Sequence, residues 1–520
     1  MVTVVIGSGA SGVAAAAGLL DRGLDRVVML DVGEEIEPEK KQVVDRLREV
    51  PDDLLDTEFS KLFSENYPSA AGTIPEKTVF GSRYPFREPA DVRKMQIRNA
   101  KVIRSFAKGG LSNVWGASAM PYHPLEIADW PIEVRDINRH YRTILEMMSV
   151  VGRKDDFAEI FPEIDYDYST PVISKQADQL LKRSSWRQRR LSENGIIVGA
   201  AHNAYLNSDG QCRSCSKCLF GCPQDIIYSA RHTLEGLIQK GLTYRSKTLV
   251  RRLMSHDSYV AIEYRDQLTN QIKILNADRV FVAAGIWNTA ALILESLQAY
   301  STKVVMKHSD RFTIPIFQHR PAIGAVEEKT NTLSQVFIEV LREKVCPKTV
   351  HMQVYGCNDF IQHRLDSLLR KTGLRALVSR EALLSRIMVA YGYIHSDYSS
   401  SLDVSLIKAR EDALSVTGVE NPESSSVARR VIRLLWGQSL TFKAFFGPFK
   451  MDPPGGGNHS GGCFPMRKNP RDFETNKWGE ISSFRRVHLV DATVLPSISG
   501  APIQLTAMAN AYRIAIEHPR

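Results

Sequence analysis

The chain opens with short apolar runs that alternate with amphipathic segments. Residues 2–7 form a nearly continuous apolar run, which is typical of a buried parallel strand. Residues 14–23 continue with helical periodicity, and 26–31 form a second apolar run that ends on Asp31. The order strand, helix, strand predicts a parallel α/β unit at this end of the chain.

The same pattern returns later in the chain. Residues 277–296 again give a strand, a turn of small residues and a helix, and should rejoin the same parallel sheet. Residues 34–95 are charged and carry scattered prolines, so we interpret them as an excursion from that domain. Residues 305–450 mix alternating segments, such as TVHMQVYG at 349–356, with basic amphipathic ones.

We therefore predict an α/β fold with a Rossmann-like domain around a parallel sheet and a second, α+β substrate or cap domain. At 520 residues the chain exceeds the size at which one core usually stops growing. The predicted Rossmann-like domain comprises 1–125, 200–304 and 451–520, and the predicted substrate domain comprises 126–199 and 305–450.

Composition excludes little. The net charge of +9 comes with no nucleic-acid motif, so we interpret it as a basic but unspecialised surface. No window of eighteen uncharged apolar residues is present, and no signal peptide precedes the first strand, which predicts a cytoplasmic protein. The basic amphipathic segments 369–386 and 429–450 are typical of cap helices that bury one face, with contact to an anionic membrane surface as the alternative.

Glycines follow the first strand in the spacing of a dinucleotide-binding turn. Gly7, Gly9 and Gly12 spell G-x-G-x-x-G, and Asp31 lies nineteen residues after Gly12. Such glycines let the backbone approach a pyrophosphate at a helix N-terminus, and the acid accepts a ribose hydroxyl. Because strand, glycines, helix, strand and acid occur in order, a chance match is improbable.

Several further motifs resemble the glucose–methanol–choline (GMC) family of flavin oxidoreductases. They include GGLSNVWGASAMPYHP from Gly109, VAAGIWNTAALILES at 282–296, NHSGGCFPM at 458–466 and the C-terminal VDATVLPSISGAPIQLTAMANAYRIA at 490–515. The segment 305–450 carries none of the resemblance. The resemblance implies FAD-dependent oxidation of an alcohol and assigns cofactor contacts to Gly7, Gly9, Ser11, Gly12, Asp31, Gly109, Gly110, Ser112, Asn113, Val250, Ala284, Gly285 and Asp491.

The resemblance also places the catalytic base at His459, in the motif H-x-x-G-[TC]-x-x-M. Histidine suits this role because its pKa lies near working pH. The family's second catalytic His or Asn falls on Ala501 or Pro502, and neither side chain hydrogen-bonds. Gln504 is the nearest amide and is our candidate, with a role in capping or solvating the next helix as the equal alternative.

Two residues refine the expected cofactor site. Val114 stands where some sugar-oxidising relatives attach FAD through a histidine, so we expect noncovalent FAD. For Asp491 we favour contact with the flavin over a role as a turn cap. Other histidines, including His123, His202 and His488, have no motif context and are interpreted as structural.

Four of the seven cysteines occur in one loop, 211–225, within the predicted FAD-binding domain. They spell C-x2-C-x2-C-x3-C-P, the run that ligates [4Fe–4S] in bacterial ferredoxins. A [3Fe–4S] centre and zinc are the alternatives, and Cys346, Cys357 or Cys463 could complete a site. The predicted metal ligands are Cys212, Cys215, Cys218 and Cys222.

These motifs together predict an FAD-dependent dehydrogenase, rather than an oxidase, that acts on CH–OH groups. The expected substrate is a small alcohol, a sugar or a sugar conjugate, and electrons would leave through the iron–sulfur cluster to a protein or quinone acceptor. A purely structural cluster is the alternative for the loop. Competing functions are a redox-silent or isomerising flavoprotein of the same fold and a non-catalytic electron-transfer or sensing flavoprotein.

Overall fold

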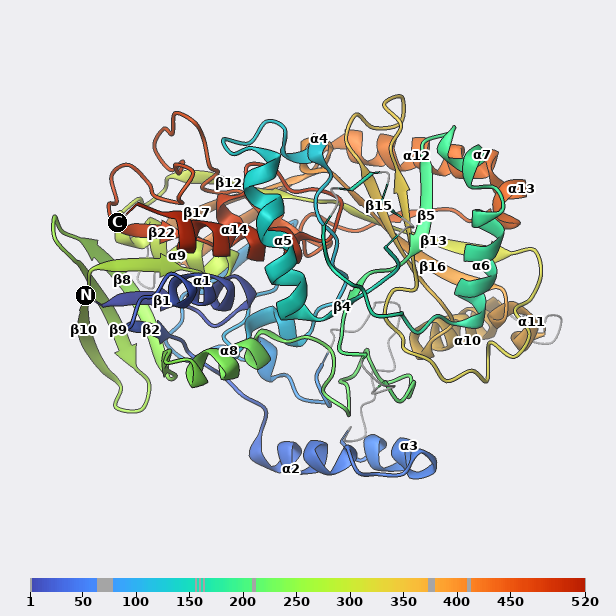
Figure 1. Ribbon diagram of the computed structural model, residues 1–520, viewed down its shortest axis with the longest axis horizontal. Helices are drawn as coiled ribbons and strands as arrows, with labels where there is room; N and C mark the ends of the chain where they lie inside the picture. Colours follow the sequence, from blue (N-terminus) through green and yellow to red (C-terminus); the bar gives the residue numbers. More distant parts are fainter. Residues whose placement is uncertain are drawn as a thin grey trace.

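The computed structural model describes residues 2–62, 78–154, 157–158, 160–161, 164–207, 212–372, 379–408 and 413–519. Gln211, the first residue of the cysteine loop, and part of the amphipathic segment 369–386 lie outside these ranges. Within the described part, no helix has the length and apolar character needed to cross a membrane. Both chain ends lie on the same side of the molecule (Figure 1).

A five-stranded parallel sheet forms the centre of the nucleotide-binding part. Its order is β22-β11-β1-β2-β7, and β1 pairs in parallel with both β2 and β11. The residues of β1 are all buried because helices cover the sheet, which explains the continuous apolar run in the sequence. The strands are β1 (Thr3–Ile6), β2 (Val27–Leu30), β7 (Thr243–Arg245), β11 (Arg279–Val282) and β22 (Val487–Leu489).

Helices from distant parts of the chain pack on this sheet (Figure 1). α1 and α14 approach closely at Gly18, where a Cβ would lie 2.9 Å from the Tyr512 carbonyl oxygen. α5, from the segment 126–199 that we assign to the substrate domain, packs against α14, and its apolar residues join the same core. The helices are α1 (Ala10–Asp21), α5 (Val134–Met148), α8 (Ala230–Gln239), α9 (Ile286–Ser296) and α14 (Ile503–Glu517).

Two further sheets flank this core. One is antiparallel, with the order β10-β9-β8, and the other has the order β21-β12-β17-β18-β3. β17 therefore pairs with β12, and β18 pairs with β17 and β3, so neither strand joins the main sheet of the substrate domain. The strands are β3 (Lys94–Arg98), β8 (Thr248–Ser255), β9 (Val260–Asp266), β10 (Gln271–Ala277), β12 (Lys303–His308), β17 (Ser401–Ile407), β18 (Ala413–Val419) and β21 (Ser460–Gly461).

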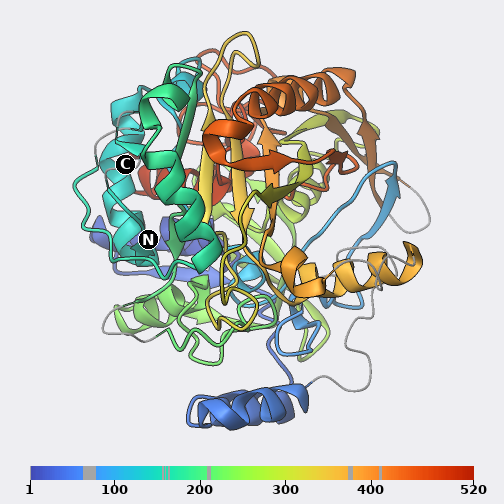
Figure 2. The ribbon, with the colours of Figure 1, turned by 90° about the vertical axis from the view of Figure 1, so that its right-hand side faces the viewer.

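The substrate domain is built on an antiparallel sheet with the order β19-β13-β16-β15-β14-β5, and β20 also pairs with β13. Apolar side chains on one face of this sheet, such as those of Val336, Val350 and Met388, pack beneath α6 and α12 (Figure 2). The other face carries polar and aromatic residues. The elements are β5 (Ile196–Ala200), β13 (Arg311–Gln318), β14 (Val336–Val340), β15 (Val350–Tyr355), β16 (Ile387–Ile394), β19 (Ala444–Phe446), β20 (Lys450–Met451), α6 (Lys175–Ser185), α7 (Gln188–Ser192), α10 (Asp359–Thr372), α11 (Arg380–Leu384), α12 (Pro422–Gly437) and α13 (Ser439–Phe442).

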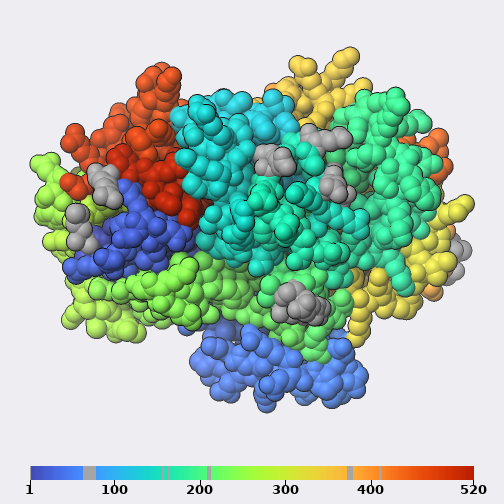
Figure 3. Space-filling view, in the orientation of Figure 1, coloured from blue at the N-terminus to red at the C-terminus, as the bar shows by residue number. Residues whose placement is uncertain are grey.

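Helices α2 (Pro38–Leu47) and α3 (Asp52–Ser60) form an arm that projects from the body of the molecule (Figures 1 and 3). The arm is pinned to the cysteine loop by ion pairs from Arg213 to Asp52 and from Lys217 to Asp56. A small apolar cluster that includes Phe59 and Phe220 lies between them. Helix α3, which lies within the excursion expected at 34–95, therefore contacts the cysteine loop.

Candidate active site

The first glycine turn joins β1 to α1 and has the form of an anion cradle. A Cβ on Gly12 would overlap the Gly7 carbonyl oxygen, so that position requires glycine for packing. A Cβ on Gly9 would meet nothing within 4 Å, although Gly9 is the N-cap of α1. The open space at the helix N-terminus is where backbone N–H groups and the helix dipole attract a phosphate. Ser11 is buried in the first turn of α1.

Asp31 lies directly after β2, where an acceptor for a ribose hydroxyl is expected. Its carboxylate accepts hydrogen bonds from the Ser8 hydroxyl and, at 3.0 Å, from the Tyr244 hydroxyl. Burial raises the pKa of Asp31 to about 6, although these donors oppose the shift. An acidic residue and two hydroxyls therefore lie beside the glycine turn.

The second glycine motif meets the first. Gly109 and Gly110 both have positive φ angles, of 85° and 59°. A Cβ on Gly110 would lie 3.3 Å from the Gly9 Cα, and the Gly109 N–H donates to the Ser8 hydroxyl at 2.9 Å. Two segments a hundred residues apart thus form one wall of the cofactor site.

Ser112 and Asn113 shape this second motif through protein contacts. The Ser112 hydroxyl donates to the Gly109 carbonyl at 2.5 Å and accepts from the Ala230 N–H at 2.8 Å. The Asn113 amide donates to the Gly110 carbonyl at 2.8 Å and accepts from the Ser229 hydroxyl at 2.9 Å. These side chains fix the loop whose backbone lines the site.

The remaining expected cofactor residues lie at strand ends. Val250 is half-buried on β8, next to a shift in the β8–β9 register. Ala284 is also half-buried, and the exposed Gly285 has a φ of 84° and caps α9, with no atom near its Cβ position.

Asp491 is committed to protein partners. It accepts from the Thr289 hydroxyl at 2.6 Å and from the Thr493 hydroxyl and N–H at 2.6 and 3.1 Å. It caps the short helix 492–494. Burial raises its pKa. Asp491 joins α9 to the C-terminal segment, which is the turn-cap role that the sequence left as the alternative.

His459 lies at the end of a glycine-rich strap over β13. A Cβ on Gly457 would overlap the Ser309 carbonyl, so the strap touches the backbone of the turn that joins β12 to β13. The His459 carbonyl accepts from the Ser309 N–H at 2.9 Å, and its imidazole stacks on Tyr393 with ring centres 4.6 Å apart. Burial, reinforced by the nearby His351, lowers the pKa of His459 to about 3. The imidazole is therefore neutral at physiological pH and offers a lone pair to a hydroxyl. Its lowered pKa makes it a weaker base than a histidine in water, which differs from the pKa near working pH expected from the sequence.

The polar face of the substrate sheet lies opposite the second glycine motif. A Cβ on Gly116 would lie 3.5 Å from the Tyr355 hydroxyl, which donates to Gln353 at 3.1 Å. Tyr355 and Tyr391 pack edge to face, with ring centres 5.4 Å apart. The alternation of TVHMQVYG contained the signal for this face, because its polar positions share one side of the strand.

The C-terminal segment passes between this sheet and α14. A Cβ on Gly500 would lie 2.5 Å from the Tyr393 carbonyl oxygen and 3.2 Å from the His351 nitrogen. Ala501 is buried beside this contact, and Gln504 is half-buried in the first turn of α14. The segment therefore approaches the sheet as backbone and brings no polar side chain from 500–502.

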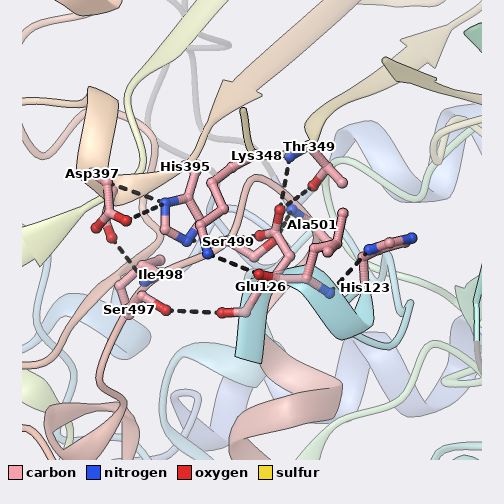
Figure 4. Close-up of polar contacts among 12 residues, drawn as sticks. His123, Glu126, Lys348, Thr349, His395, Asp397, Ser497, Ile498, Ser499 and Ala501 are labelled. Atoms are coloured by element: carbon pink, nitrogen blue, oxygen red, sulfur yellow. Dashed lines mark hydrogen bonds and ion pairs between the residues drawn. The ribbon is translucent and has the colours of Figure 1, made fainter. Parts of the chain in front are cut away.

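A buried carboxylate network holds this segment (Figure 4). The Glu126 carboxylate accepts from the Thr349 N–H and hydroxyl at 2.8 and 2.5 Å. The Ser497 hydroxyl donates to the Glu126 carbonyl at 3.2 Å, and His395 Nε2 lies 3.9 Å from the second carboxylate oxygen. Sequence reasoning missed this network, because Glu126, Thr349 and His395 lie in no recognised motif and only Ser497 belongs to the C-terminal one.

Cys212, Cys215, Cys218 and Cys222 all line one small cavity of about 20 Å³. Burial raises the pKa of the Cys218 thiol to about 12 and that of Cys222 to about 11. Four thiols are a donor set that suits zinc or an iron–sulfur cluster, and the cavity has the size of a single ion or water. Over the residues that the structure describes, no group of three or more His, Cys, Asp or Glu has the arrangement of a formed metal site.

The loop also connects to the cofactor site. Ser229, which bonds Asn113 of the second glycine motif, follows Cys222 by only seven residues. The cavity is closed on another side by Asn331 and Leu333, which precede β14.

Comparison with known proteins supports this geometry. Residues 102–302 match the family model described as GMC oxidoreductase. The structure is similar to that of pyridoxine 4-oxidase from Mesorbium loti, with a TM-score of 0.62 and 13% sequence identity over 99% of each chain. No curated protein matches the chain in sequence.

The predicted fold class is confirmed, since a parallel sheet and a second sheet domain occur in the expected order. The family match supports FAD and oxidation of CH–OH groups, and neither comparison assigns a metal to the cysteine loop. Residues 102–302 thus match the GMC oxidoreductase family model, within a chain whose fold is similar from end to end to that of pyridoxine 4-oxidase.

Proposed function

We propose that the protein is an FAD-dependent dehydrogenase that oxidises a hydroxyl group, of a sugar or sugar conjugate, to a carbonyl. The observation that carries this proposal is the position of His459, a neutral, half-buried imidazole stacked on Tyr393 at the polar face of the substrate sheet. When bound, FAD supplies the acceptor for the hydride. His459 accepts the hydroxyl proton, so that the C–H electron pair can leave.

The residues present suit FAD. The open space at Gly9 faces the N-terminus of α1, and Asp31 with Tyr244 offers polar partners for a ribose. Gly109 and Gly110 bring a second stretch of backbone to the same place. We propose that Gly7, Gly9, Ser11, Gly12, Asp31, Gly109, Gly110, Ser112, Asn113, Val250, Ala284, Gly285 and Asp491 form the FAD site, the last by positioning α9.

A sugar is supported by the composition of the sheet face. Tyr355, Tyr391 and Tyr393 offer flat apolar surfaces, and Gln353 offers an amide. Flat rings with interspersed hydrogen-bonding groups suit a molecule that is apolar on its C–H faces and polar at its edges. Pyridoxine, the alcohol named for the structural neighbour, is the matched competitor.

For the cysteine loop we propose an iron–sulfur cluster that passes electrons to a protein or quinone acceptor. The ferredoxin-like spacing and the convergence of four thiols on one cavity support it. The small cavity makes zinc the competing occupant, since a cluster would require the loop to open. Iron, sulfide and zinc analysis of anaerobically prepared protein separates the two: stoichiometric zinc without iron would end the electron-exit proposal.

The oxidation itself is tested by anaerobic mixing of the FAD-loaded protein with D-glucose, pyridoxine and benzyl alcohol while flavin absorbance is followed. The proposal predicts bleaching by at least one of them, fastest with the sugar. Turnover without bleaching would favour an isomerising flavoprotein. The absence of both turnover and bleaching would favour an electron-transfer or sensing protein. Rapid reoxidation of the bleached flavin by O₂ would make the enzyme an oxidase.

A further inference from the structure

The substrate sheet brings an imidazole to the place where the C-terminal segment has no polar side chain. Gly500 lies directly against the backbone of His351 and Tyr393, which are opposite one another on β15 and β16. The neighbouring Ala501 is the position where the resemblance predicts a second catalytic side chain. A second polar group at this site must therefore come from the sheet and not from residues 500–502.

Three side chains form a row across three adjacent strands. Glu339 on β14 is opposite His351 on β15, which is opposite Tyr393 on β16. The His351 and Tyr393 ring centres are 6.4 Å apart, and the His459 ring stacks on Tyr393. The row thus connects the proposed base to a second imidazole and a carboxylate.

The bonding of His351 leaves one nitrogen available. Its Nδ1 hydrogen-bonds the Glu339 carboxylate, and both side chains are at most 1% exposed. Among the residues that the structure describes, His351 Nε2 and His459 Nδ1 are buried atoms without a hydrogen-bond partner. Buried polar atoms are normally paired. Other buried histidines, such as His202 and His308, also leave one nitrogen unpaired, but His351 and His459 do so as neighbours beside Tyr393, where both nitrogens are open to one bound molecule.

We propose that His351, oriented by Glu339, is a second acceptor beside His459 for the single proton of the reacting hydroxyl and takes the place left empty at Ala501. This inference rests on the proposed alcohol oxidation. The hydroxyl proton is first shared between His351 Nε2 and His459 in a three-centre hydrogen bond and then passes to His459; the adjacent C–H bond breaks, its electron pair leaves with hydrogen to FAD, and the carbonyl remains.

Glu339 gives His351 a defined tautomer. A carboxylate that accepts from Nδ1–H leaves Nε2 as the acceptor, in the way that an aspartate orients the histidine of a hydrolase triad. The other charged or titratable groups near this row are His459, Tyr393, Arg311 and Glu126. Arg311 is held by Asp452 at 2.5 Å, so it is not available to pair with Glu339.

The test compares three variants in the FAD-loaded protein: His351→Ala, Glu339→Gln and the control His202→Gln. His202 is a buried histidine whose ring centre lies 6.5 Å from that of Phe337, a ring that also contacts His351, and its Nε2 lies 3.2 Å from the Arg153 carbonyl oxygen. Anaerobic flavin reduction is measured with whichever of D-glucose, pyridoxine or benzyl alcohol reduces the wild type fastest.

We expect His351→Ala to lower the limiting rate of flavin reduction about 10²-fold, within the usual range for acid–base groups. Glu339→Gln should lower it about 10-fold and change its pH profile, because an amide can donate to Nδ1 and select the wrong tautomer. His202→Gln should stay within about twofold of wild type, and the half-saturating alcohol concentration should change less than the rate in all three.

Wild-type rates and an unchanged pH profile in both His351→Ala and Glu339→Gln would overturn the inference while leaving the proposed oxidation intact. No bleaching of the wild type by any alcohol would overturn the proposed function, and this inference with it. ¹⁵N NMR of histidine-labelled protein gives a readout independent of activity. It should show one buried imidazole protonated at Nδ1 that changes in Glu339→Gln, and the absence of such a signal would refute the pairing even if a variant folded poorly.

Discussion

Alanine substitution at two glycines of one turn should affect different properties: protein stability at Gly12 and FAD binding at Gly9. The Cβ that Gly12→Ala adds would overlap the Gly7 carbonyl oxygen, so the backbone must move. Gly9→Ala places its Cβ in open space, at a φ of −62° and ψ of 174° that alanine adopts readily. The first substitution is therefore a test of packing, and the second is a test of the cofactor site.

The magnitudes differ enough to be separated. Overpacking at Gly12 should lower the free energy of unfolding by about 1–3 kcal/mol. At Gly9, restriction of the unfolded chain contributes about 0.4–1 kcal/mol and loss of a good N-cap costs about as much, so the apoprotein should be nearly unchanged. Bound FAD at a hundred times its Kd stabilises the wild type by about 2.7 kcal/mol, and Gly9→Ala should lose this contribution.

Thermal unfolding of each apoprotein, with and without added FAD, measures both effects. The wild type should gain in midpoint with FAD, Gly9→Ala should match the wild-type apoprotein without gaining, and Gly12→Ala should unfold earlier in both conditions. A Gly9→Ala protein that binds FAD with wild-type affinity would refute the location of the cofactor cradle.

Denaturation should release all FAD from the polypeptide, because Val114 offers no nucleophile for a covalent link; flavin retained by the unfolded chain would contradict this. His459→Ala should slow flavin reduction about 10²–10⁴-fold with unchanged FAD content, as stopped-flow absorbance would show. Burial lowers the pKa of His202 to about 4, whereas in the unfolded chain the imidazole takes up a proton near its ordinary pKa of about 6.5. The free energy of unfolding should therefore fall by about 3 kcal/mol as the pH drops from about 6.5 to 4, and His202→Gln should flatten that slope in denaturant titrations. Cys215→Ser should remove metal-dependent absorbance yet leave flavin reduction intact, whereas Cys346→Ser, at a buried thiol outside the loop, should change neither.

The nucleotide-binding part was predictable because its signals are local. The apolar run of β1, the glycine turn and the start of α1 are contiguous, so sequence spacing alone fixes their geometry. The convergence of the four cysteines on one cavity follows from their short spacing in the same way. The boundaries between domains were harder, since α5 packs on α14 across more than three hundred residues.

The row Glu339, His351 and Tyr393 was not predictable. Alternation in TVHMQVYG predicts that His351 and Tyr355 share a face, but nothing local says which strands lie beside β15 or in which register. Gln504 was proposed as the second catalytic residue by counting along the chain. It lies in the first turn of α14, and its catalytic role stays a prediction. Cross-strand neighbours come from topology, which a single sequence does not show.

One measurement tests the central claim most directly: a single anaerobic turnover of the FAD-loaded protein with a sugar or pyridoxine, in which reduced flavin and carbonyl product are both quantified. The account predicts one equivalent of carbonyl for each flavin reduced, and about 10²–10⁴-fold slower formation of both in His459→Ala. Flavin that stays oxidised with every alcohol, or product that forms without flavin reduction, would contradict it.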